Sequence, residues 1–460
     1  MKQNKFNIFI LLISALVFLG SCKVTQPYQH SQTVSSSLFR DVNTADTNSI
    51  AQVPWQQIFT DTLLQSLIAE GIKNNFDIKI AQARIKQAEA NFTQSREAFF
   101  PAINGNASAG FYNPSSSQSS GTQINQLYAD ASWQLDIWGK LKSAKRGAYA
   151  SLLQSDAYKR AVQTQLISGI AGNYYALLAY DEELKITLQT VENRKQDVET
   201  MKILKNSDVV TGAAVVQSAA NLYSAQVTIP DIQQNIRQTE NALCVLSGRN
   251  PGSILRDSLW NQHIAVDVNT GIPAQLLANR PDVQEAEFQV RNAFETVNAA
   301  RTYFYPSINI TGEAGLYSTS ISNFFNPASF FANIIGGLTQ PIFNNGTNTQ
   351  RLKVSQAQLE EYEITFKKTL LTAGQEVSDA LYQYKAANDK TSIRALEISN
   401  LEKAVDYTKE LLKYTSATNY TDVLTSEQGL LAARLNAVSD KLQLLQGIVT
   451  LYAALGGGWK

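Results

Sequence analysis

The sequence predicts a mainly α-helical protein with a transmembrane β-barrel, in which each chain is built from a tandem duplication. Three observations lead to this fold class. Long segments without proline carry apolar residues at heptad spacing, which is typical of coiled coils. Four shorter segments alternate apolar and polar residues over the length that a tilted strand needs to cross a bilayer. The two halves of the chain also match each other at a nearly constant offset.

Composition excludes several classes of protein. The 460 residues include 39 basic and 39 acidic side chains, so there is no basic field to attract nucleic acid. Charged residues make up 17%, against roughly 25% in an ordinary soluble domain. Long helices and a low-charge surface would both produce that bias. Two cysteines cannot form a disulfide scaffold, and two histidines argue against a histidine-based metal site.

The first residues indicate export and a lipid anchor. Lys2 and Lys5 precede an apolar run at 6–19, which has the length of a secretory signal and is too short to span a bilayer. The run ends in Leu19-Gly20-Ser21-Cys22, which resembles the processing box of bacterial lipoproteins. We therefore expect a signal peptide at 1–21, acyl chains on Cys22 and a lipidated N-terminal arm at 22–60. The alternative, an ordinary buried cysteine, fits Cys244 better, because Cys244 lies in a helical pattern.

The two halves of the chain align when one is shifted by 205 residues. A later part matches at an offset of 208. We therefore predict a first repeat at 61–248, a connector at 249–272 and a second repeat at 273–460. The matched pairs include Asn74/Asn279, Asp77/Asp282, Arg96/Arg301, Pro101/Pro306, Gly110/Gly315, Leu222/Leu430, Leu243/Leu451 and Gly248/Gly456.

Each repeat is expected to begin with helices and to continue into a strand pair. Residues 76–99 and 281–304 have helical periodicity. The period then becomes two, which predicts β-hairpins at 101–138 and 306–343. Within them the strands are expected at 102–112, 127–137, 308–317 and 331–342, and Ser/Gly/Asn-rich loops at 113–126 and 318–327.

The strands have the length and the sidedness of outer-membrane strands, with one apolar and one polar face. Aromatic residues at their ends suit an interfacial girdle: Phe99, Phe100, Trp138, Tyr303, Phe304, Tyr305 and Phe343. The alternative is a half-solvated sheet packed on a helix, which is the commoner arrangement in soluble proteins. The expected lipid anchor on the same chain reverses that preference.

Four strands cannot close a membrane barrel, because an open edge in hydrocarbon leaves its amides unpaired. Several copies must therefore share one barrel. Two copies give eight strands and a filled interior, whereas three give twelve and four give sixteen, which can leave a lumen. Composition does not choose between three and four copies.

The remaining parts of each repeat predict helical hairpins, at 141–248 and 347–455. Residues 348–414 contain no proline and form a helix on the order of 100 Å long. A break at 415–419 separates it from a partner at 420–455, and the first hairpin pairs 141–205 with 211–246. Such a heptad stripe more often marks a dimerisation rod than a pore wall. Copies held in a ring by a barrel would instead arrange their hairpins as a tube. Heptad columns along 348–414 contain Leu352, Leu359, Phe366, Ala373, Ala380 and Ala387, and Leu370, Val377, Tyr384, Ile398, Val405 and Leu412.

Several segments resemble the TolC family, and in particular its lipid-anchored NodT-type branch, the outer-membrane components of resistance-nodulation-division (RND) efflux pumps. The resemblance covers nearly the whole mature chain. It rests on Leu276-Leu277-Ala278-Asn279-Arg280-Pro281-Asp282-Val283, Phe304-Tyr305-Pro306-Ser307-Ile308, Asp136-Ile137-Trp138-Gly139-Lys140-Leu141 and Leu451-Tyr452-Ala453-Ala454-Leu455-Gly456-Gly457-Gly458-Trp459.

The resemblance implies a homotrimer in the cell outer membrane, with a 12-stranded barrel continued by a coiled-coil α-helical tunnel in the periplasm. The expected partners are outer-membrane lipid, a periplasmic adaptor (membrane fusion protein) and an inner-membrane RND transporter. The function implied is an exit duct that passively conducts drugs, metal ions or other small molecules. There are two alternatives. One is a type I secretion duct, and the other is a coiled-coil lipoprotein scaffold. The sequence does not identify the exported compound.

The resemblance also supplies candidate gate residues. Family members constrict the tunnel at the hairpin tips, often with an acid beside a Val-Leu pair, and Asp422 before Val423 and Leu424 matches that position. A ring of three such acids would favour cations, although Asp422 also suits a helix start. Tyr414 is a second candidate, but its usual arginine partner is missing, and Val215 stands where the family often has aspartate.

No enzymatic site is indicated, and no cofactor or metal is expected. There is no phosphate loop, no defined carboxylate pair and no Ser/His arrangement, and His30 and His263 lie apart in the arm and the connector. Arg280 and Asp282 are interpreted as a helix entry with a local ion pair rather than as a site.

Overall fold

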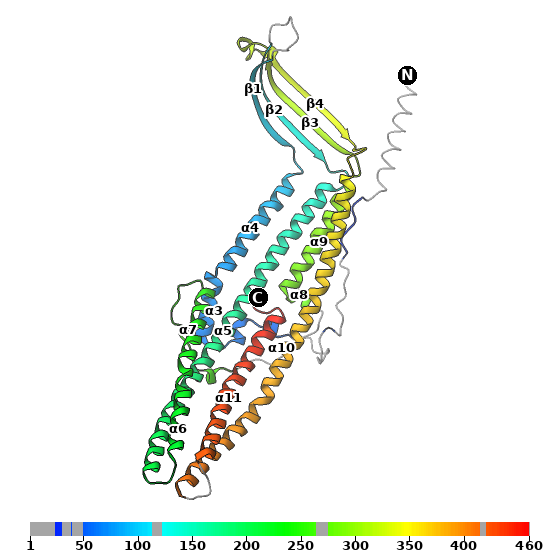
Figure 1. Cartoon of the computed structure of the whole chain (residues 1–460). Coiled ribbons are helices and arrows are strands. Elements are labelled where there is room, and N and C mark those ends of the chain that lie inside the picture. Colours follow the sequence, from blue (N-terminus) through cyan, green and yellow to red (C-terminus); the bar gives the residue numbers. More distant parts are fainter. Residues whose placement is uncertain are drawn as a thin grey trace. The chain divides into compact units, whose positions relative to one another are not determined.

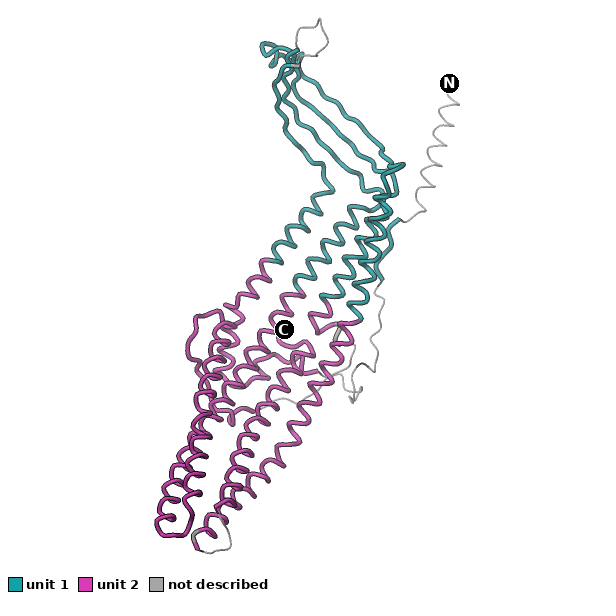
Figure 2. Tube along the Cα trace, viewed as in Figure 1, with its two compact units in different colours: residues 1–32, 84–156, 285–367 teal, residues 33–83, 157–284, 368–460 magenta. Residues whose placement is uncertain are grey.

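The computed structural model describes residues 24–29, 38, 49–112, 122–263, 275–414 and 420–459. The predicted signal peptide, Cys22 and His30 lie outside the described residues, as do 113–121, 264–274 and the turn 415–419. The chain forms two compact units, coloured separately in Figure 2. Unit 1 comprises residues 1–32, 84–156 and 285–367, and unit 2 comprises residues 33–83, 157–284 and 368–460.

Unit 1 contains a four-stranded antiparallel sheet in the order β1-β2-β3-β4 (Figure 1). Its strands are β1 (Ala102–Tyr112), β2 (Thr122–Leu135), β3 (Ser307–Ser318) and β4 (Phe330–Thr339). Each repeat contributes one hairpin, and β2 pairs with β3 across the repeats. The register sets Ile103 opposite Ala131, Trp133 opposite Ile310 and Leu338 opposite Ile308. Because opposite residues share a face, the predicted apolar residues of all four strands form one continuous surface.

The apolar face of the sheet is open in the single chain. Ile103 is 73% exposed and Ile334 is 82% exposed. The opposite face is polar, and Asp130 lies directly across from Glu313 on it. Amides hold both acids: Asn104 donates to Asp130 at 3.0 Å, and Asn333 donates to Glu313 at 3.2 Å. The sheet therefore has the two-sided character that the sequence predicts.

Two strand boundaries differ from the prediction by more than two residues. β2 begins at Thr122 instead of residue 127, because the polar residues before Leu127 pair with β1 as far as Tyr112 opposite Thr122. Their composition alone predicts a loop. β4 ends at Thr339 instead of residue 342, since Pro341 has no N–H for a ladder.

Helices make up most of the described chain. None of them carries an apolar stretch of the length that a membrane crossing requires, within the residues described. The helices before the strands end two residues earlier than predicted, because the residue before each following proline avoids the helical conformation. The helices are α2 (Trp55–Ile58), α3 (Thr62–Asn74), α4 (Phe76–Glu97), α5 (Lys140–Asn206), α6 (Gly212–Gln226), α7 (Thr228–Leu246), α8 (Leu276–Asn279), α9 (Pro281–Thr302), α10 (Thr347–Tyr414) and α11 (Tyr420–Ala454).

The return helix of the first hairpin is interrupted, although the sequence predicted one helix at 211–246. It is divided into α6 and α7 at Val227. Pro230 lies in the first turn of α7, where its missing N–H costs nothing. A continuous helix would need that N–H to bond to Gln226, so proline starts a new helix here.

The heptad columns of α10 are confirmed by burial. Phe366, Ala373, Val377, Ala380 and Ala387 are all at most 5% exposed. In unit 2 the core gathers from α3, α5, α7 and α11, and Cys244 is fully buried as predicted. The largest fully buried side chains there are Phe59, Leu64, Ile68, Ile167, Ile170, Tyr174, Leu177, Leu178, Leu243, Leu259 and Leu451.

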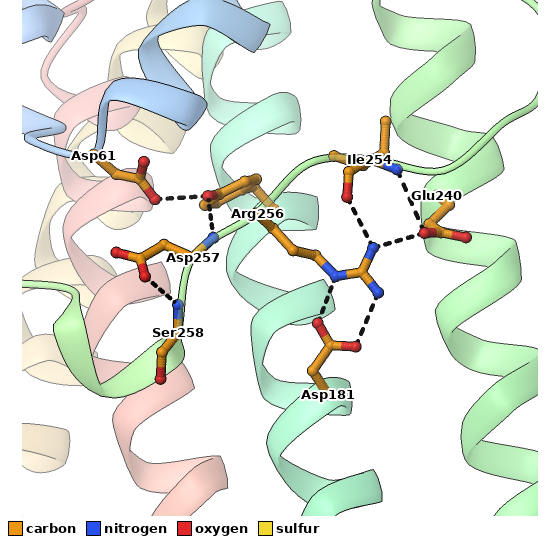
Figure 3. A network of polar contacts seen from close by, with 8 residues as sticks. Asp61, Asp181, Glu240, Ile254, Arg256, Asp257 and Ser258 are labelled. Carbon is orange, nitrogen blue, oxygen red and sulfur yellow. Dashed lines mark hydrogen bonds and ion pairs between the residues drawn. The ribbon is translucent and has the colours of Figure 1, made fainter.

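The described part of the connector is attached to the helices of unit 2 by a polar network (Figure 3). The Arg256 guanidinium bonds Asp181 on α5 through two nitrogens and Glu240 on α7 at 2.6 Å. The Asp257 amide donates to the Tyr174 hydroxyl at 3.1 Å, and that hydroxyl donates to Asp61 at 2.6 Å. Asp61 caps α3. The connector thus joins the start of the first repeat to its two hairpin helices.

Both repeats end their last helix in the same way. Gly248 has φ 68°, and a Cβ there would lie 2.6 Å from the carbonyl oxygen of Asn74. Gly456 has φ 84°, and its Cβ would lie 2.4 Å from the carbonyl oxygen of Asn279. Only glycine combines this backbone conformation with such a close approach. The duplication read from the sequence is therefore visible as a repeated joint.

Candidate functional site at the helical hairpin tips

The ends of the two helical hairpins lie together in unit 2 (Figure 1). Met201 from α5 packs with Tyr420 and Val423 from α11 in a small apolar cluster. Val215 on α6, which stands where the resembled family often has aspartate, packs against this cluster. Because the two tips share a core, a movement of one hairpin tip disturbs the other. Partly buried members of the cluster are Leu204, Val210, Ala214, Val215, Leu412 and Leu424.

Asp422 lies in the first turn of α11 and is exposed. The next residue, Val423, is 3% exposed and holds this turn against the cluster. The helix start is favourable for an acid, since the free amides there carry partial positive charge. The two interpretations of Asp422, as a helix-start acid and as a pore-facing acid, are therefore compatible.

Tyr414 is the last residue of α10 and is 82% exposed. It lines an open groove of about 370 Å³ together with Tyr407, Glu410 and Leu411. Tyr414 and Asp422 are therefore both exposed at the tip and lie close together in the sequence.

A charged network above the tip cluster was not predicted. Lys409 on α10 lies 3.5 Å from Asp197 on α5 and also forms an ion pair with Glu427 on α11. The side chains are 36%, 19% and 15% exposed, respectively. One lysine thus joins the first hairpin to both helices of the second.

The environment shifts the protonation equilibria of this network. Burial raises the pKa of Glu427 above its usual range, while Lys409 opposes that shift. Burial lowers the pKa of Lys409, but Glu427 and Asp197 outweigh burial and leave the pKa above its usual value. Lys409 is therefore charged at neutral pH, and Glu427 is the group in the network that acid protonates more easily than an ordinary glutamate.

Similar pairs continue along the second hairpin. Arg394 on α10 binds Asp440 on α11 at 2.8 Å, and Arg434 on α11 binds Glu402 on α10 at 2.8 Å. A sequence signal for such pairs exists. Asp440 falls seven residues after buried Ala433 and seven before buried Gly447, so it is an acid within an apolar heptad column. Such an acid requires a basic partner on the facing helix.

Arg280 is 7% exposed, and its guanidinium group binds acids and a carbonyl of unit 2. It binds Asp282 at 2.6 Å and Glu376 at 2.7 Å, and it donates to the Ala454 carbonyl at 2.8 Å. A cavity of about 720 Å³ lies beside it, lined by α5, α10 and α11. The local ion pair expected from the sequence is present, and the guanidinium fastens the end of α11.

Metal-binding chemistry is not found in the described part of the chain. His, Cys, Asp and Glu side chains there form no group of three that could hold an ion.

Together, the two-sided sheet and the long helical hairpins define an outer-membrane channel, in which a transmembrane β-barrel is combined with a helical tunnel. The chain belongs to the outer membrane efflux protein family, whose profile matches residues 67–249 and 272–457. It is a channel component of an efflux pump in the outer membrane, as its family resemblance indicated.

Relatives and a solved structure agree with this assignment. The cation efflux system protein CusC of Escherichia coli O6:H1 is 29% identical over 456 residues, which are 96% of this chain and 97% of CusC. SilC of Salmonella typhimurium, a probable outer membrane lipoprotein, is 26% identical over 462 residues and 99% of each chain. A crystal structure of CusC superposes with a TM-score of 0.84 and 26% identity over 95% of this chain and 100% of CusC.

Proposed function

We propose that three copies of the chain form one exit duct, in which each copy supplies four strands of a 12-stranded barrel and two hairpins of a helical tunnel. The four-stranded sheet with its open apolar face carries this proposal, because strand edges in lipid must be paired. Twelve or sixteen strands are enough to leave a lumen, whereas eight are not, and the family resemblance favours three copies over four. A measured mass of three protomers in detergent would support the assembly, and a stable monomer would exclude it.

The duct receives its substrate from an inner-membrane RND transporter through a periplasmic adaptor. This part of the proposal is supported by the relatives, which are components of efflux systems. We assign residues 1–21 to a signal peptide and Cys22 to a lipid anchor in the outer membrane. The repeats are assigned to 61–248 and 273–460, separated by the connector.

Asp422 forms the constriction, as a ring of one carboxylate from each protomer. Two observations support this role: Asp422 is exposed, and the next residue, Val423, is buried and fixes this helical turn. Three acids held close together attract cations and repel anions. Tyr414 stabilises the closed arrangement by contact with a neighbouring protomer, for which its exposed ring is available.

The substrate class is small solutes, and metal cations are the best candidates. CusC belongs to a cation efflux system, and an acidic constriction suits cations. A type I secretion duct is the second candidate, but the efflux relatives argue against it. Genomic neighbours that encode an adaptor and an RND transporter would support the first, and neighbours that encode a secretion ATPase would support the second.

Conductance in planar bilayers tests the constriction. We would compare the wild type with Asp422→Ala, Tyr414→Ala and the matched control Asp389→Ala, which removes an exposed acid elsewhere on α10. Small cation-selective steps are expected from the wild type and the control. Asp422→Ala should lose cation selectivity, and Tyr414→Ala should give larger steps. Unchanged selectivity in Asp422→Ala would refute its role, and silence from all folded, assembled variants would favour the scaffold alternative.

A further inference from the structure

Two basic side chains meet on one aromatic ring in unit 1. The Lys140 ammonium lies 4.5 Å from the centroid of the Tyr303 ring, and the Arg351 guanidinium lies 3.9 Å from the same centroid. Their separation therefore cannot exceed the sum of these two distances. Tyr303 is fixed in place, because its carbonyl accepts a hydrogen bond from the Asn348 amide at 2.7 Å.

Neither cation has an acidic partner among the described residues. No carboxylate of the described residues lies within ion-pair distance of Lys140 or Arg351, and the Arg351 guanidinium bonds only the neutral Asn348 side chain, at 3.4 Å. Asp136 lies close in the chain, but its two oxygens accept the amides of Leu141 and Lys142 at 2.9 and 2.8 Å. Asp136 thus compensates the start of α5, whereas α10 begins here without an acid in its first turn. Together these groups form a local excess of positive charge, which favours an anion.

The pair lies at the end of the sheet that carries the aromatic girdle. The Trp138 ring stacks on Tyr305 at 5.0 Å and donates its N–H to the Pro306 carbonyl at 2.7 Å. The Trp133 indole donates likewise to Phe99 at 2.9 Å. Indole rings with a satisfied N–H are typical of the membrane–water interface. Ile342 and Phe343, just beyond the last strand, are 98% and 85% exposed.

The expected lipidated arm is held at the same end. Asn298 on α9 exchanges two hydrogen bonds with the backbone of Gln26, at 3.0 and 2.9 Å. A Cβ on Gly139 would lie 3.2 Å from the Thr25 hydroxyl, so the arm passes directly beside Lys140. An arm that follows a lipid anchor should lie at the membrane surface, which agrees with the girdle.

We propose that Lys140 and Arg351 bind the phosphate of an anionic glycerophospholipid in the leaflet that faces the periplasm. Ammonium and guanidinium groups form charge-assisted hydrogen bonds with phosphate oxygens, and guanidinium can bind two at once. The acyl chains of the lipid lie against the exposed apolar side chains at the end of the sheet. This inference depends on the outer-membrane location of the sheet and is independent of the constriction at the hairpin tips.

Lipid binding by the purified full-length assembly tests the proposal. Native mass spectrometry would count phosphatidylglycerol and phosphatidylcholine retained by the wild type, by Lys140→Gln/Arg351→Gln and by Lys86→Gln/Lys367→Gln. The last variant removes two exposed lysines of unit 1 that lie on the helices away from the girdle. The site variant should lose about 30-fold in phosphatidylglycerol affinity, at about 1 kcal/mol per basic residue near the surface. The control should bind as the wild type does.

Two further measurements distinguish lipid binding from binding of free phosphate and from a folding defect. Inorganic phosphate at matched ionic strength should not displace phosphatidylglycerol, because it lacks acyl chains, and displacement would overturn the lipid assignment. Arg351→Lys keeps the charge and should retain most of the affinity. Equal phosphatidylglycerol binding by the wild type and the site variant would overturn the proposal whatever the conductance measurements give.

Discussion

Removing Lys409 should loosen the hairpin tips, and Lys409→Met is the variant of choice because it keeps the length of the side chain. The lysine lies between Asp197 and Glu427, whose side chains are only 19% and 15% exposed. Without it, two partly buried carboxylates face each other unpaired. Breaking a fully buried pair costs about 3–5 kcal/mol, and an exposed pair contributes at most about 1 kcal/mol.

The network lies between these limits, because Lys409 itself is 36% exposed. We therefore expect a cost of about 1.5 kcal/mol per protomer, most of it relieved when the hairpins separate and water reaches the acids. A difference of about 1.4 kcal/mol changes an equilibrium tenfold. The splayed state should accordingly be about tenfold more populated in Lys409→Met.

Single-channel recording in planar bilayers measures this population as the fraction of time spent at high conductance. Lys409→Arg keeps the charge and should resemble the wild type. Lys403→Met, which removes an exposed lysine from the same helix, should also have no effect. Adding Glu427→Gln to Lys409→Met should partly restore closure, since it removes one of the opposed charges.

Acid should have the same effect as Glu427→Gln in the Lys409→Met background. Burial and Asp197 raise the pKa of Glu427, and Lys409 is the group that lowers it. Without the lysine, Glu427 therefore protonates at higher pH, and the repulsion that opens the tips disappears as the pH falls. A Lys409→Met channel that is folded, assembled and indistinguishable from the wild type at neutral pH would refute this account of the network.

Three further predictions concern the fold. Ile310→Arg on the apolar face should reduce outer-membrane assembly, at a cost of about 1 kcal/mol per site because Ile310 lies opposite Trp133 near the interface, while Thr311→Arg on the polar face should assemble normally; equal yields in membrane fractions would contradict the barrel assignment. Gly456→Ala should lower the melting temperature more than Gly346→Ala does, because both have positive φ but only Gly456 faces a carbonyl within contact distance. Burial raises the pKa of Tyr452 to about 12 from 10.0, so the wild type should lose roughly 2–3 kcal/mol more stability than Tyr452→Phe as the pH rises through this window; parallel pH curves would exclude the assignment.

The sheet was predictable because every second residue of a strand lies on the same face, and lipid exposure requires the residues of that face to be apolar. The alternation of apolar and polar side chains gave β1 its bounds and placed Ile103, Trp133 and Ile310 on one face. The start of β2 was not predictable in the same way, since Thr122 and Gln123 have loop composition and become strand residues only by pairing with β1. The break at Val227 carried a signal, Pro230, that the heptad pattern on either side obscured.

The candidate site was less accessible to sequence analysis, because its function depends on side chains from three helices. The sequence predicts only that Asp422 lies in the first turn of a helix, which the structure confirms. It does not reveal that Lys409 reaches Asp197, more than two hundred residues away in the chain. Glu427 is an acid four residues after buried Val423, so the spacing could have indicated a paired acid in an apolar stripe.

The duplication explains why the Arg280 segment resembles a site without being one. In the first repeat, the Asn75 amide donates to the Leu246 carbonyl at 3.0 Å, near the end of the last helix. In the second repeat Arg280 takes the place of Asn75 and donates to the corresponding carbonyl, that of Ala454, at 2.8 Å. Both bonds satisfy a helix carbonyl that has no partner within its own helix. The guanidinium has nitrogens left over, and Asp282 and Glu376 are the acids that a buried cation then requires. Asp282 has a counterpart in the first repeat, Asp77, so Arg280 places a cation beside an acid that both repeats share, and function is to be sought at the tips and in the membrane.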